Sequence, residues 1–81
     1  MKKILVTGAS GWLGTAIVKA LLARGDAVIG TDIVISPATT ALATRYPALT
    51  AVAADLFGWH HLGRLLNYHR LEGVIHGGSM G

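Results

Sequence analysis

The sequence contains no cysteine among its 81 residues, so neither a disulfide framework nor a thiolate metal site is available. Charge is scarce as well, because Asp, Glu, Lys and Arg together make up 14% of the chain, against 52% hydrophobic residues. A chain this apolar is not disordered. Strands that are buried on both faces, as in a parallel sheet covered by helices, account for the composition.

Long hydrophobic runs are also missing. The apolar run that starts at Ile4 ends at Val6, which is too short for the core of a signal peptide. No run approaches the roughly 18 apolar residues of a membrane span, so we expect a cytoplasmic protein that does not enter a membrane. The net charge is +3, but the 7 Lys and Arg residues are scattered, which argues against a nucleic-acid-binding surface.

The pattern of apolar residues predicts a single domain over residues 1–81 in which strands and helices alternate. Strands are expected over residues 3–7, 26–32, 48–54 and 72–76, and helices over residues 12–24, 36–46 and 56–69. The short connections imply right-handed crossovers and a parallel sheet. The predicted fold class is α/β, a doubly wound parallel sheet with the strand order 3-2-1-4.

Several residues mark the expected helix ends. Gly25 is placed as the C′ residue of the first helix, and Ser36 with Pro37 forms an N-cap and N1 pair for the second, which Pro47 stops. The first helix also has a stripe of helical spacing, which is expected to consist of Leu13, Ile17, Ala20, Leu21 and Arg24.

The stretch VTGASGWLGTA, residues 6–16, places Gly8, Gly11 and Gly14 between a strand and a helix. The first glycine suits a tight turn, the second lets a pyrophosphate approach the backbone, and the third lets the helix pack closely. The free N–H groups and the positive dipole end of the helix would then face the anion. No lysine stands between Gly8 and Lys19, which excludes a Walker A loop.

The segment TGASGWLG resembles the fingerprint of the short-chain dehydrogenase/reductase superfamily, in particular its extended group of NAD-dependent epimerases, dehydratases and reductases. The resemblance covers essentially the whole chain, but it corresponds to the first half of the nucleotide-binding domain of such an enzyme. It therefore implies an incomplete Rossmann-type sheet, a fragment of a longer chain, and NAD as the cofactor.

Three further segments carry this resemblance. Asp32 ends the second strand, where an acidic residue accepts hydrogen bonds from the adenosine ribose, although a carboxylate there is often only a cap or turn residue. The ADL segment, residues 54–56, resembles the Asp-Leu or Asp-Val pair that follows the third strand in this superfamily and lies against the adenine. The VIHGG segment, residues 74–78, resembles the segment at the end of the fourth strand that usually reads His-x-Ala-Ala in this superfamily. Glycines replace the alanines here, which is expected to leave the backbone beside the cofactor looser. The implied cofactor contacts are Gly8, Ser10, Gly11, Trp12, Leu13, Gly14, Asp32, Ile33, Asp55, Leu56, Gly77 and Gly78.

Other side chains have simpler expected roles. His76 is predicted to be a hydrogen-bonded core residue, and the Trp12 ring is expected to pack while its N–H faces phosphate. His60, His61 and His69 lack a zinc-binding spacing and are expected to be solvated helix residues.

The catalytic pair of the superfamily, Tyr-x-x-x-Lys, is missing from this chain. Tyr46 is followed four residues later by Thr50, and Tyr68 by Glu72, so we expect no catalytic residue here. Two functions stay open. The chain is either the NAD-binding part of an oxidoreductase or sugar-nucleotide epimerase/dehydratase, or a non-catalytic nucleotide-binding or self-associating module. In the second case the apolar edge at residues 74–76, from Val74 to His76, would pair with another chain.

Overall fold

The structure is a computed structural model that describes residues 2–53 and 71–77. This part contains strands β1 (Lys3–Thr7), β2 (Ala27–Asp32), β3 (Leu49–Ala53) and β4 (Gly73–His76), and helices α1 (Trp12–Ala23) and α2 (Pro37–Arg45). Each element predicted within these residues is present, with ends that differ by one residue or so. The helix predicted over residues 56–69 lies outside the described residues.

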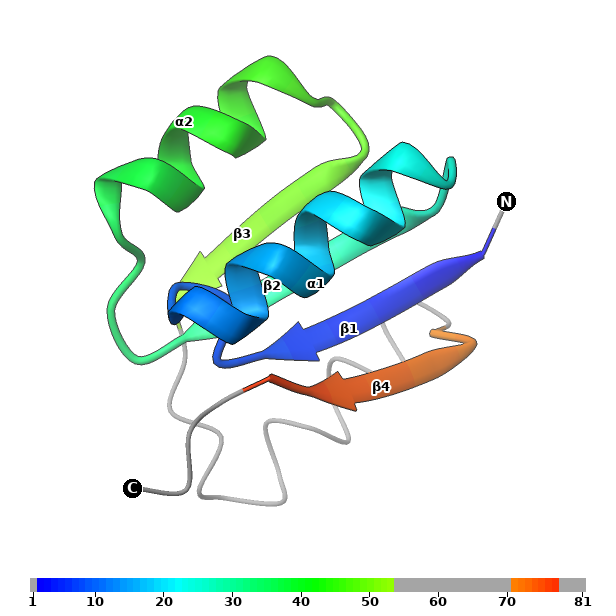
Figure 1. Cartoon of the computed structure of the whole chain (residues 1–81), viewed down its shortest axis with the longest axis horizontal. Coiled ribbons are helices and arrows are strands. Elements are labelled where there is room, and N and C mark those ends of the chain that lie inside the picture. Colours follow the sequence, from blue (N-terminus) through cyan, green and yellow to red (C-terminus); the bar gives the residue numbers. More distant parts are fainter. Residues whose placement is uncertain (1, 54–70, 78–81) are drawn as a thin grey trace.

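The four strands form one parallel sheet in the order β3-β2-β1-β4, as the sequence predicts. Helices α1 and α2 lie on the same face of this sheet (Figure 1). Both follow from the topology, because β1-α1-β2 and β2-α2-β3 are crossovers of the same hand that proceed in the same direction. The chain reverses direction across the sheet when it returns to place β4 beside β1.

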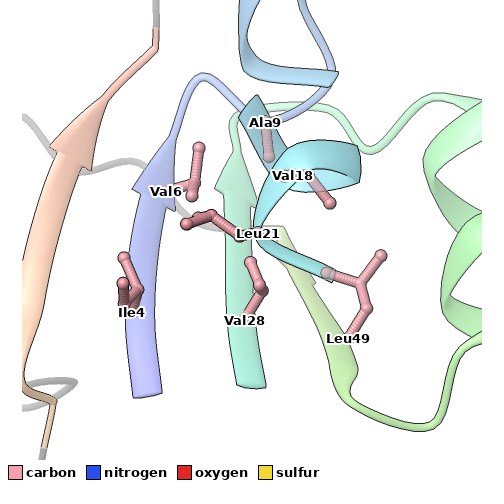
Figure 2. Close-up of a cluster of buried hydrophobic side chains, with 7 residues drawn as sticks. All are labelled: Ile4, Val6, Ala9, Val18, Leu21, Val28 and Leu49. Carbon is pink, nitrogen blue, oxygen red and sulfur yellow. The ribbon is translucent and has the colours of Figure 1, made fainter. Parts of the chain in front are cut away.

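The core fills the space between this face and α1 (Figure 2). Its buried side chains are Ile4, Val6, Ala9, Val18, Leu21, Val28 and Leu49. On the opposite face Leu5 and Ile29 are neighbours in the strand register, and both are buried. Strands β1 and β2 are therefore buried on both faces, which explains their apolar runs at residues 4–6 and 27–29.

The face of α1 that meets the core differs from the predicted stripe. Gly14, Val18 and Leu21 are buried, whereas Leu13 is 43% exposed and Ala20 is exposed. Arg24 is exposed as well. The inclusion of Leu13, Ala20 and Arg24 was wrong, because the close packing of Gly14 rotates the inner stripe of the helix by one residue. The sequence spacing alone did not contain that contact.

Helix α1 ends in a complete Schellman motif. The N–H of Gly25 donates to the carbonyl of Leu22 at 3.0 Å, and the N–H of Asp26 donates to the carbonyl of Leu21 at 3.0 Å. Gly25 has φ 91°, which confirms its predicted place at C′. The buried Asp26 carboxylate then binds Arg24, with its Oδ2 2.7 Å from Nη2.

The role of Gly25 predicts a difference between two glycine substitutions. A Cβ added at Gly25 or at Gly73 meets no atom within 4 Å, but only Gly25 has a positive φ. Gly25→Ala should therefore lower the free energy of unfolding by about 1 kcal/mol, the strain of a side chain in the left-handed region. Gly73→Ala should not lower it, because alanine restricts the unfolded chain more than glycine does. Urea unfolding of both variants measures the difference, and equal effects would contradict the assignment.

Candidate functional site

The candidate site lies at the carboxyl edge of the sheet, where β1, β2 and β4 end. The loop of residues 8–11 leads from β1 into α1, Asp32 is the last residue of β2, and Gly77 follows β4. The order of the strands reverses between β1 and β4. In open α/β sheets this reversal opens a crevice outside the strand ends, where ligands bind.

Two of the three loop glycines are required by the fold itself. Gly8 has φ 65°, which side chains rarely adopt. A Cβ on Gly14 would lie 2.7 Å from the carbonyl carbon of Gly8 and closer still to its oxygen. This contact confirms that the third glycine allows close packing of the helix.

Gly11 is different, because nothing within the fold demands a glycine there. Its backbone is extended, with φ −74° and ψ 168°. A Cβ at this position would meet only the Gly8 carbonyl oxygen, at an ordinary contact distance of 3.4 Å. Gly11 is also exposed, so the space beside it is open to a ligand.

The amino end of α1 keeps its hydrogen-bond donors free of side-chain caps. Gly11 is the N-cap residue and supplies no side-chain hydrogen bond, and the first turn contains no acidic residue. The N–H groups of Trp12, Leu13 and Gly14 have no partner within the helix. Helix α2 instead is capped by Ser36, whose Oγ accepts from the N–H of Thr39 at 3.2 Å. Of these two helices, only α1 presents an uncapped, positive end to an anion.

Asp32 faces the same loop from the end of β2. Its Oδ2 accepts the N–H of Ser10 at 3.0 Å, and its Oδ1 accepts the N–H of Ile33 at 2.8 Å. Two backbone donors thus fix the orientation of the carboxylate. Each oxygen retains a free lone pair, so the group can accept two further hydrogen bonds. A vicinal diol is a ligand group that supplies two adjacent hydroxyl donors, one for each carboxylate oxygen.

Ser10 joins this carboxylate to α2. Its Oγ accepts the N–H of Ser36 at 2.9 Å and lies 3.0 Å from the Oγ1 of Thr39. Ser10 is among the residues predicted from the sequence, whereas Thr39 is not. The signal that was present is the position of Thr39, the third residue after the Ser36 cap, where a polar side chain turns back toward the N-cap.

The end of β4 is held against β1 and α1. Thr7 Oγ1 and His76 Nδ1 are 2.8 Å apart, and the N–H of Gly77 donates to the Thr7 carbonyl at 2.8 Å. A Cβ on Gly77 would lie 2.8 Å from the Gly14 Cα. Gly77 is thus closely packed, and the expectation of a looser backbone at this residue was wrong. His76 is hydrogen-bonded as predicted, but it is exposed instead of buried, because it ends a strand at the edge of the sheet.

The structure brings most of the predicted cofactor residues to this edge. They are Gly8, Ser10, Gly11, Trp12, Leu13, Gly14, Asp32, Ile33 and Gly77, whereas Asp55, Leu56 and Gly78 lie outside the described residues. Trp12 is 83% exposed, so the expectation that its ring packs was wrong.

Within residues 2–53 and 71–77, no three His, Cys, Asp or Glu side chains are grouped so that they could hold a metal ion. In the same part of the chain, neither helix has the length and apolarity needed to cross a membrane.

The parallel sheet, its order and the glycine loop define a Rossmann-type α/β fold. The model of the NAD dependent epimerase/dehydratase family matches residues 4–81. The chain belongs to this family, which confirms the resemblance carried by the glycine segment. No curated protein sequence matches the chain significantly.

Solved structures share the fold. A UDP-glucose-4-epimerase from Stenotrophomonas maltophila, with bound NAD and formylated UDP-arabinopyranose, has a TM-score of 0.85 and 21% identity over 100% of this chain. The Bordetella bronchiseptica enzyme WbmH, in complex with NAD+, has a TM-score of 0.74 and 28% identity over 94% of this chain. A dTDP-glucose 4,6-dehydratase from Bacillus anthracis, in complex with NAD, has a TM-score of 0.81 and 17% identity over 94% of this chain. The match spans 25%, 25% and 26% of these three chains, respectively.

The glycine contacts predict that two neighbouring positions respond differently to the same substitution. Gly14→Ala forces a methyl group into the Gly8 peptide and should lower the free energy of unfolding by at least about 1–3 kcal/mol, the usual range for overpacking. Gly11→Ala makes one ordinary contact and should change stability by less than about 0.5 kcal/mol. Thermal or urea unfolding monitored by circular dichroism compares the two. Similar losses in both variants would show that Gly11 is also a packing residue.

Proposed function

We propose that the chain binds NAD at this edge, as the amino-terminal part of an NAD-dependent oxidoreductase or sugar-nucleotide epimerase/dehydratase. The single observation that carries the proposal is the Asp32 carboxylate, oriented by two backbone N–H groups beside the uncapped end of α1. The two features suit the two polar parts of adenosine diphosphate. The NAD or NAD+ present in the three related structures supports the choice of cofactor.

The pyrophosphate belongs at the glycine loop. The N–H groups at the start of α1 point out of the helix, and the absence of a Cβ at Gly11 leaves room for phosphate oxygens to approach. The backbone N–H groups of Trp12 and Leu13, two exposed residues in the uncapped first turn, supply donors.

The adenosine ribose belongs at Asp32, whose two remaining lone pairs accept the 2′ and 3′ hydroxyl protons. A 2′-phosphate at the same place would bring like charge to the carboxylate. Residues 33–36, Ile-Val-Ile-Ser, contain no arginine or lysine to offset it. The site therefore favours NAD over NADP. Ile33, Asp55, Leu56, Gly77 and Gly78 complete the proposed set of cofactor contacts.

The chemistry of the reaction is proposed to come from residues outside this chain. The match spans about a quarter of the three related chains, and neither Tyr46 nor Tyr68 is followed by lysine four residues later. We therefore propose that residues 1–81 form a half-domain of a longer protein and contribute binding and orientation of the cofactor. The cytoplasm is the proposed compartment.

Calorimetric titration of the chain with NAD and NADP tests the proposal. The parent chain should bind NAD more tightly than NADP. Asp32→Ala removes a charge-assisted hydrogen bond, which contributes about 1.5–3 kcal/mol, so the Kd for NAD should rise roughly tenfold or more. The Kd for NADP should stay the same or fall, because a repulsion is removed. The ratio of the two constants is the quantity to compare.

Gly11→Val is a second variant for this titration, and it tests the glycine loop. Its side chain occupies the open space beside the Gly8 carbonyl and should abolish binding of both nucleotides, while the circular dichroism spectrum stays near that of the parent. An unchanged NAD affinity in Gly11→Val would remove the loop from the site. Equal affinities of the parent for NAD and NADP would reduce Asp32 to a turn residue.

A second candidate function is self-association through β4. Among the described strands, β4 pairs with β1 on one side and with no strand on the other. Free backbone groups along such an edge can pair with another chain. This second candidate is compatible with NAD binding as part of a longer protein. In that case a further segment of the same protein would pair with the β4 edge.

Sedimentation of the 81-residue chain at micromolar concentrations should accordingly show dimers or larger species. Val74→Lys should shift them to monomer, because charged residues on an edge strand oppose pairing. Val52→Lys, the same change on the other edge strand, β3, should not. A stable monomer in the parent chain would rule out the edge as a site of association.

A further inference from the structure

The hydroxyl of Thr39 is a buried polar group that links the candidate site to α2. The residue is 1% exposed, and its Oγ1 lies 3.0 Å from Ser10 Oγ and 3.0 Å from Ser36 Oγ. The three hydroxyls come from two segments that are far apart in sequence, the glycine loop and the start of α2. Thr39 is the member that contacts both of the others.

The number of available protons determines what Thr39 does in this cluster. Ser10 Oγ already accepts the Ser36 N–H, and Ser36 Oγ already accepts the Thr39 N–H. If both serines donated to Thr39, its own proton would be buried without an acceptor, which is unfavourable. Thr39 therefore donates to one serine, while its oxygen remains available to the proton of the other. A hydroxyl is the only small side-chain group that can perform both roles here.

The cluster continues to the Asp32 carboxylate. Ser10, which Thr39 holds through its side chain, donates its backbone N–H to Asp32 Oδ2 at 3.0 Å. The Ser36 N–H bond to Ser10 Oγ at the same time fixes residues 33–36 against the glycine loop. This segment contains no lysine or arginine, so a 2′-phosphate at Asp32 would meet the like charge of the carboxylate with nothing in residues 33–36 to offset it.

We propose that Thr39 is a positioning residue for the ribose site. Its buried hydroxyl holds Ser10, and through Ser10 it holds both the Asp32 carboxylate and residues 33–36 in the arrangement that accepts a ribose diol and excludes a 2′-phosphate. The inference rests on the proposed function, since it assigns part of the preference for NAD over NADP to a residue that touches neither nucleotide.

The test compares three variants in titrations with NAD and NADP. Thr39→Val keeps the shape of the side chain and removes the hydroxyl, Thr39→Ser keeps the hydroxyl, and Thr44→Val makes the same change at an exposed threonine of α2. Thr39→Val should lower the preference for NAD by about threefold to tenfold, the range expected for one hydrogen bond. Thr39→Ser should restore the preference, and Thr44→Val should leave it unchanged.

A second readout requires no nucleotide. Amide hydrogen exchange at Ser10 should become faster in Thr39→Val than in the parent, Thr39→Ser or Thr44→Val, because the Ser10–Asp32 bond loses its support. If Thr39→Val does not fold, Ser10→Ala removes the same link from the loop side and should lower the preference for NAD in the same way.

The possible failures are distinguishable. A parent chain that binds neither nucleotide overturns the proposed function, and this inference with it. A parent that prefers NAD, together with an unchanged preference in folded Thr39→Val, overturns this inference alone. Loss of the preference in Thr44→Val as well would also overturn it, because the effect would then belong to the helix and not to the buried hydroxyl.

Discussion

The structure depends on the contact between the Gly8 carbonyl and the first turn of α1. The Gly8 oxygen accepts the N–H of Gly11 at 3.1 Å, and only a glycine at position 14 leaves room for that peptide. Two hydrogen bonds of Ala9 secure the turn. The Ala9 N–H donates to the Thr31 carbonyl, and the Thr15 hydroxyl donates to the Ala9 carbonyl. These contacts place the start of α1 over the ends of β1 and β2. They thereby also determine which face of the helix packs against the sheet.

A second, polar link extends this placement to α2. Ser10 follows directly on the tightest part of the turn, and it bonds Asp32 through its backbone and both Ser36 and Thr39 through its side chain. Two helices and one strand end are therefore positioned by four consecutive residues, 8–11. This arrangement explains how a short chain with few charged residues can present an oriented carboxylate beside an uncapped helix end.

Much of this could be predicted from the sequence, because the signals are local. Runs such as KILVT, the Ser36–Pro37 pair and Gly25 identify strands and helix ends within a few residues of themselves, and the glycine spacing identifies the loop. The features that prediction missed arise from contacts between distant segments. The packing of Gly77 on Gly14, the exposure of His76 and the enclosure of Thr39 depend on how β4 and α2 meet the loop, and no short window of sequence contains that information.

The position of β1 between β2 and β4 has a consequence for the order of folding. Pairing β1 with β2 joins Ile4 to Val28, whereas pairing β1 with β4 joins the same Ile4 to Gly73 across most of the chain. The entropy lost in closing a loop rises with its length, and contacts of large sequence separation form slowly. Strands β1 to β3 with their two helices can therefore assemble as a nucleus during synthesis, and β4 docks afterwards. Until β4 docks, the edge of β1 that faces away from β2 has no partner strand, and a partly synthesised chain can mispair there.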